Sequence, residues 1–487
     1  MDTKKLRQKI LDLAIRGKLV PQDPNDEPAS VLLERIRAEK EQLIKEGKIK
    51  RSKKSAATDK SHYENVPFEI PESWAWCKLD NLAFYKKGPF GSSLTKSMFI
   101  PDNGDAYKVY EQKNAIQNDS NLGHYFISGE KFQELKGFEV LPNDIIVSCA
   151  GTIGETYIMP SDIRSGIINQ ALMIIRLHNI DITPFYLLYF DFILKNEAGK
   201  DGKGTAIKNI PPFDILKNYW IPLPPLAEQD RIIKEVALWQ CLIDSIDGNI
   251  EDIFKLSKKT KSKILDLAIS GKLVPQDPND EPAIELLKRI NPDFKPCDNS
   301  HYENLPQGWV KLRLGDVCSF ERGITFPSSA KCTIKQPGMI ACIRTANVQD
   351  NLELDDLWYV GNEYIKGNTE KLVRKNDIIM SSANSRELVG KVSYVHDLTE
   401  QMTFGGFVLN IRANECILHF FLFLILRTLY LKGYYLTIAT QTTNIANLNT
   451  KILGNIEVLL PPLTEQVRII NTVNKILARI DNITAEL

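Results

Sequence analysis

The chain has 487 residues, of which 43% are hydrophobic and 25% charged, and its 61 Lys and Arg balance its 61 Asp and Glu. This length suits two to four folded domains, and the neutral balance excludes a protein that attracts nucleic acid or membrane through its overall charge. The eight cysteines include no C-x-x-C pair, which indicates free thiols in a reducing compartment rather than a disulfide framework or a zinc site.

We expect neither a secretory signal nor a membrane helix. The N-terminal segment has no long apolar stretch followed by a small-residue cleavage site. The longest apolar run starts at Ile417, but His419 and Arg427 interrupt it, and it is shorter than the roughly 20 residues that a membrane helix needs. A buried helix is the better interpretation of this run, and we expect a cytoplasmic protein.

A twenty-residue segment occurs twice, at residues 10–29 and 264–283, and the copies differ only at Arg16 and Ser270. Further matches are "HYEN" at His62 and His301, "NDII" at Asn143 and Asn376, and "PPL-x-EQ-x-RII" at Pro224 and Pro461. The chain is therefore an internal duplication. Retention of the repeat for a shared partner surface is the favoured explanation, and duplication or gene conversion without selection is the alternative.

A heptad pattern follows each "EQ" and predicts long coiled-coil helices. The central seam positions are Ile232, Val236, Trp239, Ile243, Ile246, Ile250, Ile253, Ile264 and Leu267. The C-terminus repeats the pattern at Ile469, Val473, Ile476, Ile480, Ile483 and Leu487, and the N-terminus continues it at Leu6, Ile10 and Leu13. The central copy is predicted to be one helix of about 40 residues. Its twin is split between the two ends of the chain, so the duplication is circularly permuted.

Each long helix is predicted to end at a glycine, Gly17 or Gly271, because a proline follows four residues later. The polar turn "PQDPNDEPA" then leads into a short amphipathic helix, expected at residues 31–36 in the first copy and at residues 284–290 in the second.

Residues 62–226 and 301–463 are two variable regions of related plan. Each opens with a strand beside a tryptophan, and short apolar segments between Gly, Asn and Asp favour mixed β-structure. A hairpin is predicted around each "NDII", followed by a helix. In the first region Thr183 is the expected N-cap and Pro184 the first helical residue. Polar loops complete both regions.

The segment from Lys45 to Lys60 has seven Lys and Arg against two acids. A flexible solvated linker is the favoured interpretation, and an arm that contacts phosphates is the alternative.

Motifs for catalysis are weak. The segment "NIPPF" at Asn209 is close to the motif with which amino-methyltransferases hold adenine, but Ile210 stands in the place of the first proline. No glycine-rich loop follows a strand to hold S-adenosylmethionine, and no Walker loop or H-E-x-x-H motif occurs. We therefore expect no catalytic residue and no metal site in this chain.

The "KILDLAI-x-GKLVPQDPNDEPA" segments, the "PPL-x-EQ-x-RI" helix starts and the "NDII" stretches resemble the specificity subunit of type I restriction-modification systems. The resemblance covers essentially the whole chain. It implies an α+β fold with two mixed α/β target recognition domains, separated by long antiparallel coiled-coil helices in a circularly permuted pseudo-two-fold repeat. The domain organisation is then a helical half-repeat at 1–46, a basic linker at 47–61, recognition domain 1 at 62–226, a central helical region at 227–290, a linker at 291–300, recognition domain 2 at 301–463 and a C-terminal helix at 464–487.

The resemblance further implies that each domain reads one half of a split double-stranded DNA sequence and that the helices set the gap. The implied partners are two methylase subunits and the restriction-translocase subunits. S-adenosylmethionine, ATP and Mg²⁺ are expected in those partners and no cofactor in this chain.

Base readers are expected among Arg, Lys, Asn, Gln, Ser and Thr in loops flanked by glycine. The candidates in domain 1 are Lys86, Lys87, Ser92, Gln112, Asn114, Thr152, Lys203 and Lys208. In domain 2 they are Arg322, Arg344, Asn347, Asn384, Arg386, Gln441, Thr442 and Asn444. Lys and Arg number 15 against 19 acids in residues 62–226 and 16 against 15 in residues 301–463, so neither domain is basic. We expect partner subunits to supply most of the DNA affinity.

Two other functions remain possible from the residues alone. A protein-only scaffold would use its twin domains to bind peptides or subunits. A self-sufficient methyltransferase would bind S-adenosylmethionine itself.

Overall fold

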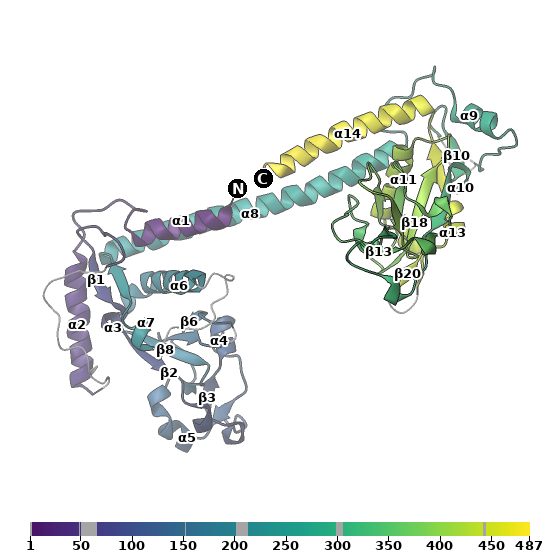
Figure 1. Ribbon diagram of the computed structural model, residues 1–487. Helices are drawn as coiled ribbons and strands as arrows, with labels where there is room; N and C mark the ends of the chain where they lie inside the picture. Colours follow the sequence, from purple (N-terminus) through teal and green to yellow (C-terminus); the bar gives the residue numbers. More distant parts are fainter. Residues whose placement is uncertain are drawn as a thin grey trace. The chain divides into compact units, whose positions relative to one another are not determined.

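The computed structural model describes residues 2–47, 49, 66–150, 152–200, 213–298, 305–441 and 445–487 (Figure 1). The chain forms two compact units, the N-terminal unit Asp2–Gly248 and the C-terminal unit Asn249–Leu487. Both contain helices and β-sheets, which confirms the predicted α+β class. Helix α8 (Leu226–Ile269) has 44 residues and continues from the first unit into the second.

The N-terminal unit contains α1 (Thr3–Ile15), α2 (Ala29–Lys45), β1 (Ala75–Lys78), α3 (Leu79–Leu82), β2 (Ala83–Lys87), β3 (Tyr107–Tyr110), α4 (Gln112–Ile116), β4 (Phe126–Ile127), α5 (Gly129–Glu134), β5 (Ile145–Ser148), β6 (Thr156–Ile158), β7 (Gly166–Ile168), β8 (Leu172–Leu177), α6 (Thr183–Lys200), α7 (Phe213–Leu216), β9 (Trp220–Leu223) and the first part of α8. The largest buried cluster of this unit lies around Leu79, Phe185 and Ile232. Two smaller clusters, around Tyr110 and around Phe132, lie beside the three-stranded sheet.

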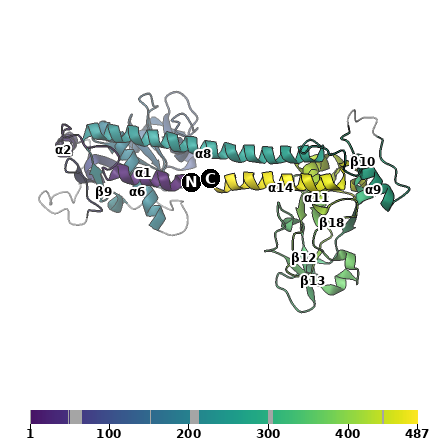
Figure 2. The same ribbon diagram turned by 90° about the horizontal axis from the view of Figure 1, so that it is seen from above.

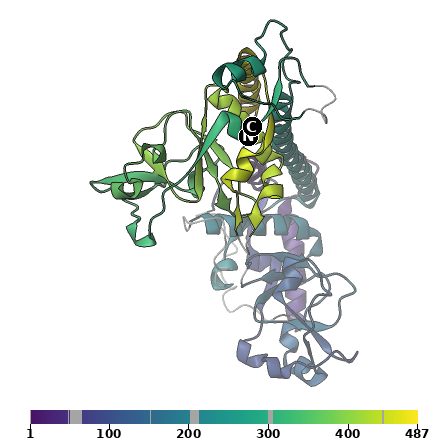
Figure 3. The same cartoon turned by 90° about the vertical axis from the view of Figure 1, so that its right-hand side faces the viewer.

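The C-terminal unit contains the rest of α8, α9 (Ala283–Ile290), β10 (Val310–Arg313), α10 (Leu314–Val317), β11 (Cys318–Arg322), β12 (Met339–Ile343), β13 (Trp358–Gly361), β14 (Ile378–Ser381), β15 (Ala383–Asn384), β16 (Val392–Tyr394), β17 (Met402–Phe404), β18 (Val408–Ala413), α11 (His419–Leu431), α12 (Tyr434–Ile438), β19 (Thr440–Gln441), β20 (Ala446–Asn447), α13 (Thr450–Gly454), β21 (Glu457–Leu460) and α14 (Leu463–Ala485). Figure 3 shows the strands of this unit in green and yellow-green.

The two variable regions share one strand topology. A four-stranded antiparallel sheet has the order β2-β8-β5-β6 in the N-terminal unit and β11-β18-β14-β16 in the C-terminal unit. A three-stranded sheet, β4-β3-β7 or β13-β12-β17, contains one parallel pair in each case. The first and last strands of each region pair with one another, β1 with β9 and β10 with β21. The predicted hairpins β5–β6 and β14–β16 are confirmed.

The repeated sequence motifs contact each other inside each unit. In the N-terminal unit Trp74 Nε1 donates a hydrogen bond to Glu228 Oε2 at 2.9 Å, and Gln22 Nε2 donates to Glu228 Oε1 at 2.6 Å. Arg231 forms an ion pair with Asp26 at 2.5 Å. The turn "PQDPNDEPA" is therefore fastened to the "EQDR" segment that begins α8.

The C-terminal unit repeats these contacts with Gln276, Trp309, Glu465, Asp280 and Arg468. Glu228 and Glu465 are both buried in the first turn of a long helix, where the helix dipole favours a negative charge. Burial nevertheless raises the pKa of each carboxyl, while the hydrogen bonds from Trp and Gln oppose that rise. Part of the near-identity of the repeat thus corresponds to the same network in both units.

A glycine is required where each long helix ends. Gly17 has φ +65° and Gly271 has φ +70°, a backbone region that favours glycine. A Cβ at Gly17 would lie 2.4 Å from Pro71 Cγ, and one at Gly271 would lie 2.5 Å from Pro306 Cγ. The predicted helix ends are confirmed, and the turn also packs closely against the strand-opening tryptophans.

Helices α1 and α14 each lie antiparallel to a part of α8 (Figure 2). Arg7 of α1 contacts Asp244 at 2.7 Å and Asp247 at 2.9 Å, and Lys261 of α8 contacts Asp481 of α14. Seam residues such as Ile232, Val236 and Ile243 are buried in the N-terminal unit, as are Ile264, Ile469 and Val473 in the C-terminal unit. Each unit therefore pairs one part of α8 with a terminal helix, as the circular permutation predicts.

The predicted seam is wrong at two positions, because Ile253 is 37% exposed and Ile483 is 59% exposed. Ile483 lies in the last turn of α14, which ends at Ala485, and Ile253 lies in α8, eight residues before Lys261, the partner of Asp481.

Two local predictions also need correction. Helix α2 extends over residues 29–45, well beyond the expected 31–36, since strong helix formers continue after its buried positions. Lys40 Nζ in the added turns donates a hydrogen bond to the Asp80 carbonyl oxygen at 2.7 Å. Thr183 is not an N-cap, because its backbone is helical and its hydroxyl donates to the Ile180 carbonyl oxygen at 2.6 Å.

Among the helices of the described residues, none combines the length and the apolar character that crossing a membrane requires.

Candidate nucleic-acid interface

Both units place a polar turn after the inner strand of the three-stranded sheet, β3 or β12. In the N-terminal unit the buried Asn114 accepts a hydrogen bond from the Glu111 backbone N–H and donates to the Asp119 and Leu122 carbonyl oxygens. Since its amide is fully occupied and has no exposed surface, Asn114 holds the turn together.

The C-terminal unit builds the same turn with Asn347, which accepts from the Arg344 backbone N–H and donates to the Asp356 carbonyl oxygen. The equivalent turn-opening residues, Glu111 and Arg344, have opposite charges. The two asparagines were predicted as base readers, and the structure gives both a local structural role.

The other predicted readers differ in exposure. Lys87, Ser92, Thr152, Arg322, Arg386 and Gln441 are exposed, whereas Lys86, Gln112, Arg344 and Asn384 are partly buried. Lys203, Lys208, Thr442 and Asn444 lie outside the described residues, as do the "NIPPF" residues before Phe213 and most of the basic segment after Gly47.

The structure brings some of these side chains to equivalent or neighbouring positions. Lys87 and Arg322 each end the edge strand of the four-stranded sheet, opposite Met173 and Leu409 respectively. Each is followed by a glycine that packs against backbone, so a cation extends from the same rim in both units.

Asn384 and Gln441 lie close together in a small sheet of order β15-β20-β19. Both pair with Ala446, one from each side, although 57 positions separate them in the sequence (441 − 384 = 57). Asn and Gln are the side chains that read adenine through two hydrogen bonds. Arg386 is exposed in the loop between β15 and β16, next to this sheet.

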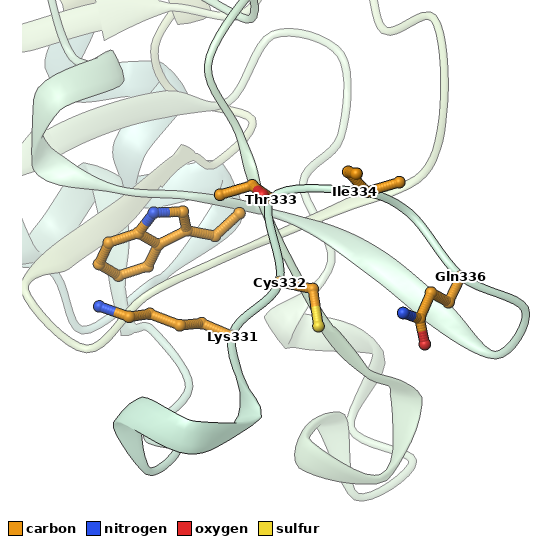
Figure 4. Close-up of a pocket in the computed structure, with 6 residues that line it drawn as sticks. Lys331, Cys332, Thr333, Ile334 and Gln336 are labelled. Carbon is orange, nitrogen blue, oxygen red and sulfur yellow. The ribbon is translucent and has the colours of Figure 1, made fainter.

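A cavity of about 360 Å³ opens beside Trp358 in the C-terminal unit (Figure 4). Lys331 Nζ lies 4.3 Å from the centre of the Trp358 ring, and Arg344 Cζ lies 5.0 Å from it. Arg344 also contacts Asp356, while its buried Nε has no hydrogen-bond partner among the described residues. The lining also includes Cys332, Thr333, Ile334 and Gln336. An indole with two cations and exposed polar neighbours is suited to contact a base or a phosphate.

The equivalent place in the N-terminal unit has different chemistry. The bridge between Ile100 and Phe126 corresponds to that between Cys332 and Tyr359, so Phe99 and Tyr125 occupy the positions of Lys331 and Trp358. The rings of Phe99 and Tyr125 stack at 4.4 Å. One frame therefore presents an aromatic pair in one unit and a cation with an indole in the other.

Sequence reasoning missed Lys331, Trp358, Phe99 and Tyr125. They lie outside the Gly-flanked loops on which the prediction was based. Only alignment of the two regions through their strand pairing reveals that these side chains occupy equivalent positions.

All eight cysteines are free, and burial raises the pKa of Cys77 to about 12 and that of Cys149 to about 11. Thiols of this kind are poor nucleophiles at neutral pH. Within the described part of the chain, no group of three or more His, Cys, Asp or Glu side chains could hold a metal ion.

The repeated turn also presents identical exposed residues that form no hydrogen bond with the buried glutamate of their unit. These are Pro21, Asp23, Pro24, Asn25 and Glu27 in the first copy and Pro275, Asp277, Pro278, Asn279 and Glu281 in the second. The same surface is therefore available once in each unit.

Both units have the same strand topology but carry unlike side chains at equivalent exposed positions. This arrangement is typical of a protein with two related binding domains. The family model for the type I restriction modification DNA specificity domain matches residues 71–236 and 306–487. The chain belongs to this family. It is thus a DNA-specificity subunit of a type I restriction-modification system, a component that recognises DNA and is not itself the catalyst.

Relatives and a solved structure agree with this assignment. The EcoAI specificity subunit of Escherichia coli is 30% identical over 451 residues, which cover 78% of this chain and 72% of that protein. The EcoEI specificity subunit of Escherichia coli is 29% identical over 380 residues, covering 64% of this chain and 61% of that protein. A chain from a structure of a type I R-M system, solved to study its complex assembly and conformational transition, is 19% identical with a TM-score of 0.52. It covers 86% of this chain and 94% of its own length, and it supports the fold.

Proposed function

We propose that each unit reads one half of a bipartite double-stranded DNA sequence and that the long helices fix the gap between the halves. The observation that carries this proposal is the shared frame with unlike contents, Phe99 and Tyr125 in one unit and Lys331 and Trp358 in the other. Two related domains that recognise different DNA sequences share a scaffold and differ in the side chains that enter the DNA groove.

The exposed polar side chains supply the reading chemistry. Arg322 and Arg386 can donate two hydrogen bonds to guanine, and Gln441 can pair with adenine. Asn384 donates to Ser381 Oγ at 3.1 Å and accepts from the Ser385 backbone N–H at 2.8 Å, so its amide is partly committed within its own domain. In the N-terminal unit Lys87, Ser92 and Thr152 are the corresponding candidates. Lys86 lies with its Nζ 4.5 Å from the centre of the Phe138 ring, so it is partly committed within its own domain.

The partners follow from the repeated surface. We infer that the identical exposed turn residues dock two methylase subunits, one on each unit, because one partner bound twice requires the same surface twice. Restriction-translocase subunits complete the assembly. S-adenosylmethionine, ATP and Mg²⁺ belong to those partners in this proposal.

An exchange of recognition domains tests the proposal. Residues 301–463 are replaced by the equivalent region of another specificity subunit, and the methylated sequence is read from genomic DNA of cells that carry the methylase. We expect one half of the sequence to change while the other half and the spacer stay the same. The matched control exchanges residues 62–226 and should change only the opposite half.

Other outcomes would contradict the proposal. An unchanged methylated sequence after both exchanges would favour a protein-only scaffold. Retention of S-adenosylmethionine by the purified chain in equilibrium dialysis would favour a self-sufficient methyltransferase.

A separate test asks whether this chain or the methylase subunit supplies most of the affinity for DNA. Since neither recognition region is basic in sum, the isolated chain should bind DNA weakly, and added methylase should raise both affinity and specificity. Strong sequence-specific binding by the chain alone would contradict this division.

A further inference from the structure

The second part of α8 carries a strongly basic surface. Residues 254–264 contain five lysines and no acid. Lys261 is committed to Asp481 of α14, whereas Lys255, Lys258, Lys259 and Lys263 are exposed. A chain with no net charge and no basic recognition domain thus concentrates positive charge on this helix.

These lysines line a groove between α8 and the end of α11. The groove has a volume of about 560 Å³, and Leu431 and Lys432 of the α11 end form its other wall. We call it the lysine groove, defined by Lys255, Lys258, Lys259, Ser262, Lys263, Asp266, Leu431 and Lys432.

Acidic groups neutralise only part of the lysine groove. Asp266 contacts Lys432 and lies 3.4 Å from Lys263, and Lys255 forms an ion pair with Glu251 at 2.8 Å. Lys258 and Lys259 have no hydrogen bond or ion pair from their side chains within the described residues. The groove therefore has excess positive charge.

The same charges recur in the N-terminal unit. Residues 3–9 of α1 correspond to 257–263 of α8 at the offset of the repeat, and Lys4, Lys5 and Lys9 match Lys258, Lys259 and Lys263. The committed cation recurs as well, because Arg7 pairs with Asp244 just as Lys261 pairs with Asp481. Neighbouring positions differ between the two copies; Leu6, for example, corresponds to Thr260. The positive charges therefore recur even though the residues between them do not.

We propose that the lysine groove binds the phosphodiester backbone of duplex DNA without reading its sequence. This inference rests on the proposed function and adds a contact surface outside the recognition domains. Lys255, Lys259 and Lys263 recur every four residues, about 6 Å apart along one helix face. Duplex DNA offers a dense row of phosphates to such a face, and lysine binds phosphate as a point charge. An acidic protein partner fits less well, because lysine is depleted in protein–protein interfaces.

The test removes three positive charges from the groove of the full-length chain. The triple variant K258Q/K259Q/K263Q keeps residues of good helix propensity. Its binding to a short labelled duplex of arbitrary sequence is measured between about 50 and 200 mM salt. We expect the slope of log affinity against log salt to become shallower by about 2.7, since each lost phosphate contact changes the slope by about 0.9. Affinity at low salt should fall at least about tenfold.

Two matched controls accompany this variant. K288Q/K295Q/K475Q removes three exposed lysines elsewhere in the same unit and should leave the slope unchanged. K258R/K259R/K263R keeps the charge and should bind as the native chain does. Circular dichroism verifies that all three variants retain the native helix content.

Several outcomes would overturn the inference. An unchanged salt slope in the triple glutamine variant would do so, as would a slope lost equally in the K288Q/K295Q/K475Q control. Intact DNA binding with loss of methylase co-purification would assign the groove to an acidic protein surface instead. In cells, the variant should methylate the same sequence less completely, and a changed methylated sequence would mean that the groove reads bases. The domain exchange remains an independent test of the proposed function, because it depends on which bases change and not on salt.

Discussion

His178 is a buried titratable side chain of the N-terminal unit, and its Nε2 has no hydrogen-bond partner among the described residues. Burial, with a smaller effect from Lys40, lowers its pKa from 6.5 to about 4. The equivalent position in the C-terminal unit holds Asn414, whose Nδ2 donates a hydrogen bond to the Asp316 carbonyl oxygen at 2.9 Å. The repeat therefore supplies a natural neutral replacement for this histidine.

We predict that His178→Asn removes a pH dependence of stability. The folded chain holds the imidazole neutral, whereas the unfolded chain protonates it below pH 6.5. The contribution of the neutral imidazole to the free energy of unfolding is therefore present above pH 6.5. It is lost as the pH falls towards 4, by up to about 3 kcal/mol. Urea unfolding of both proteins at pH 7 and near pH 4 measures the difference. Equal losses in the native chain and the variant would contradict the prediction, since their carboxyl groups are the same.

Lys331 and Trp358 give a prediction about specificity at the same scale. We expect Trp358→Leu and Lys331→Gln to relax recognition at one base position of one half-site, by about 1–3 kcal/mol in discrimination, and to leave the other half unaltered. Sequencing of methylated genomic DNA detects the change. Tyr125→Leu is the matched control and should affect the opposite half-site. An effect of all three substitutions on the same half would argue against two separate readers.

At the scale of elements, the buried carboxylates Glu228 and Glu465 fasten the start of a long helix to a polar turn and a tryptophan. We predict that Trp309→Phe destabilises the C-terminal unit by about 1.5–3 kcal/mol, because it leaves Glu465 without a hydrogen bond from the indole. Trp74→Phe should do the same to the N-terminal unit. Hydrogen exchange resolved along the chain measures both, with the start of α14 responding to the first substitution and the start of α8 to the second. Loss of protection in the same helix for both variants would be inconsistent with two separate networks.

The sequence predicted these elements better than their contacts. The heptad spacing identifies α8 and α14, and Gly17 and Gly271 mark helix ends by a local backbone rule. The contact of Gln22 with Glu228 joins residues 206 positions apart, and nothing in local patterning indicates such a pair. For the same reason an exposed partner surface could not be distinguished from an internal network within the repeated segment.

Candidate reading residues were predicted by residue type, which says nothing about burial or hydrogen-bond partners. It selected Asn114 and Asn347 because amides read adenine, yet both amides form hydrogen bonds to backbone groups of their own turns. It overlooked Trp358, since an aromatic residue in a strand is ordinarily part of a core. Burial and hydrogen-bond partners, which only the fold supplies, decide between these roles.

At the scale of the whole molecule, α8 is the segment that continues from one unit into the other. We predict that a seven-residue insertion after Gly248, two helical turns that preserve the heptad register, lengthens the spacer of the methylated sequence by about three base pairs. Seven residues add about 10 Å of helix, and one base pair occupies about 3.4 Å. Genomic methylation mapping reads the spacer directly. A spacer of unchanged length in a folded, active assembly would show that α8 does not set it.

The twin segments at residues 10–29 and 264–283 also have a consequence for the gene. Nucleotide sequences that encode almost identical peptides can misalign during recombination, and a crossover here deletes 254 codons, leaving 233 (487 − 254 = 233). The product joins the beginning of α1 to the second recognition domain and α14. In it, the "KILDLAI" residues of α1 take the place of those that α8 contributes to that unit in the full-length chain. Such a deletion yields a half-length chain with one reader and every fastening contact in place, so the duplicated coding sequence makes the locus a ready source of shortened descendants.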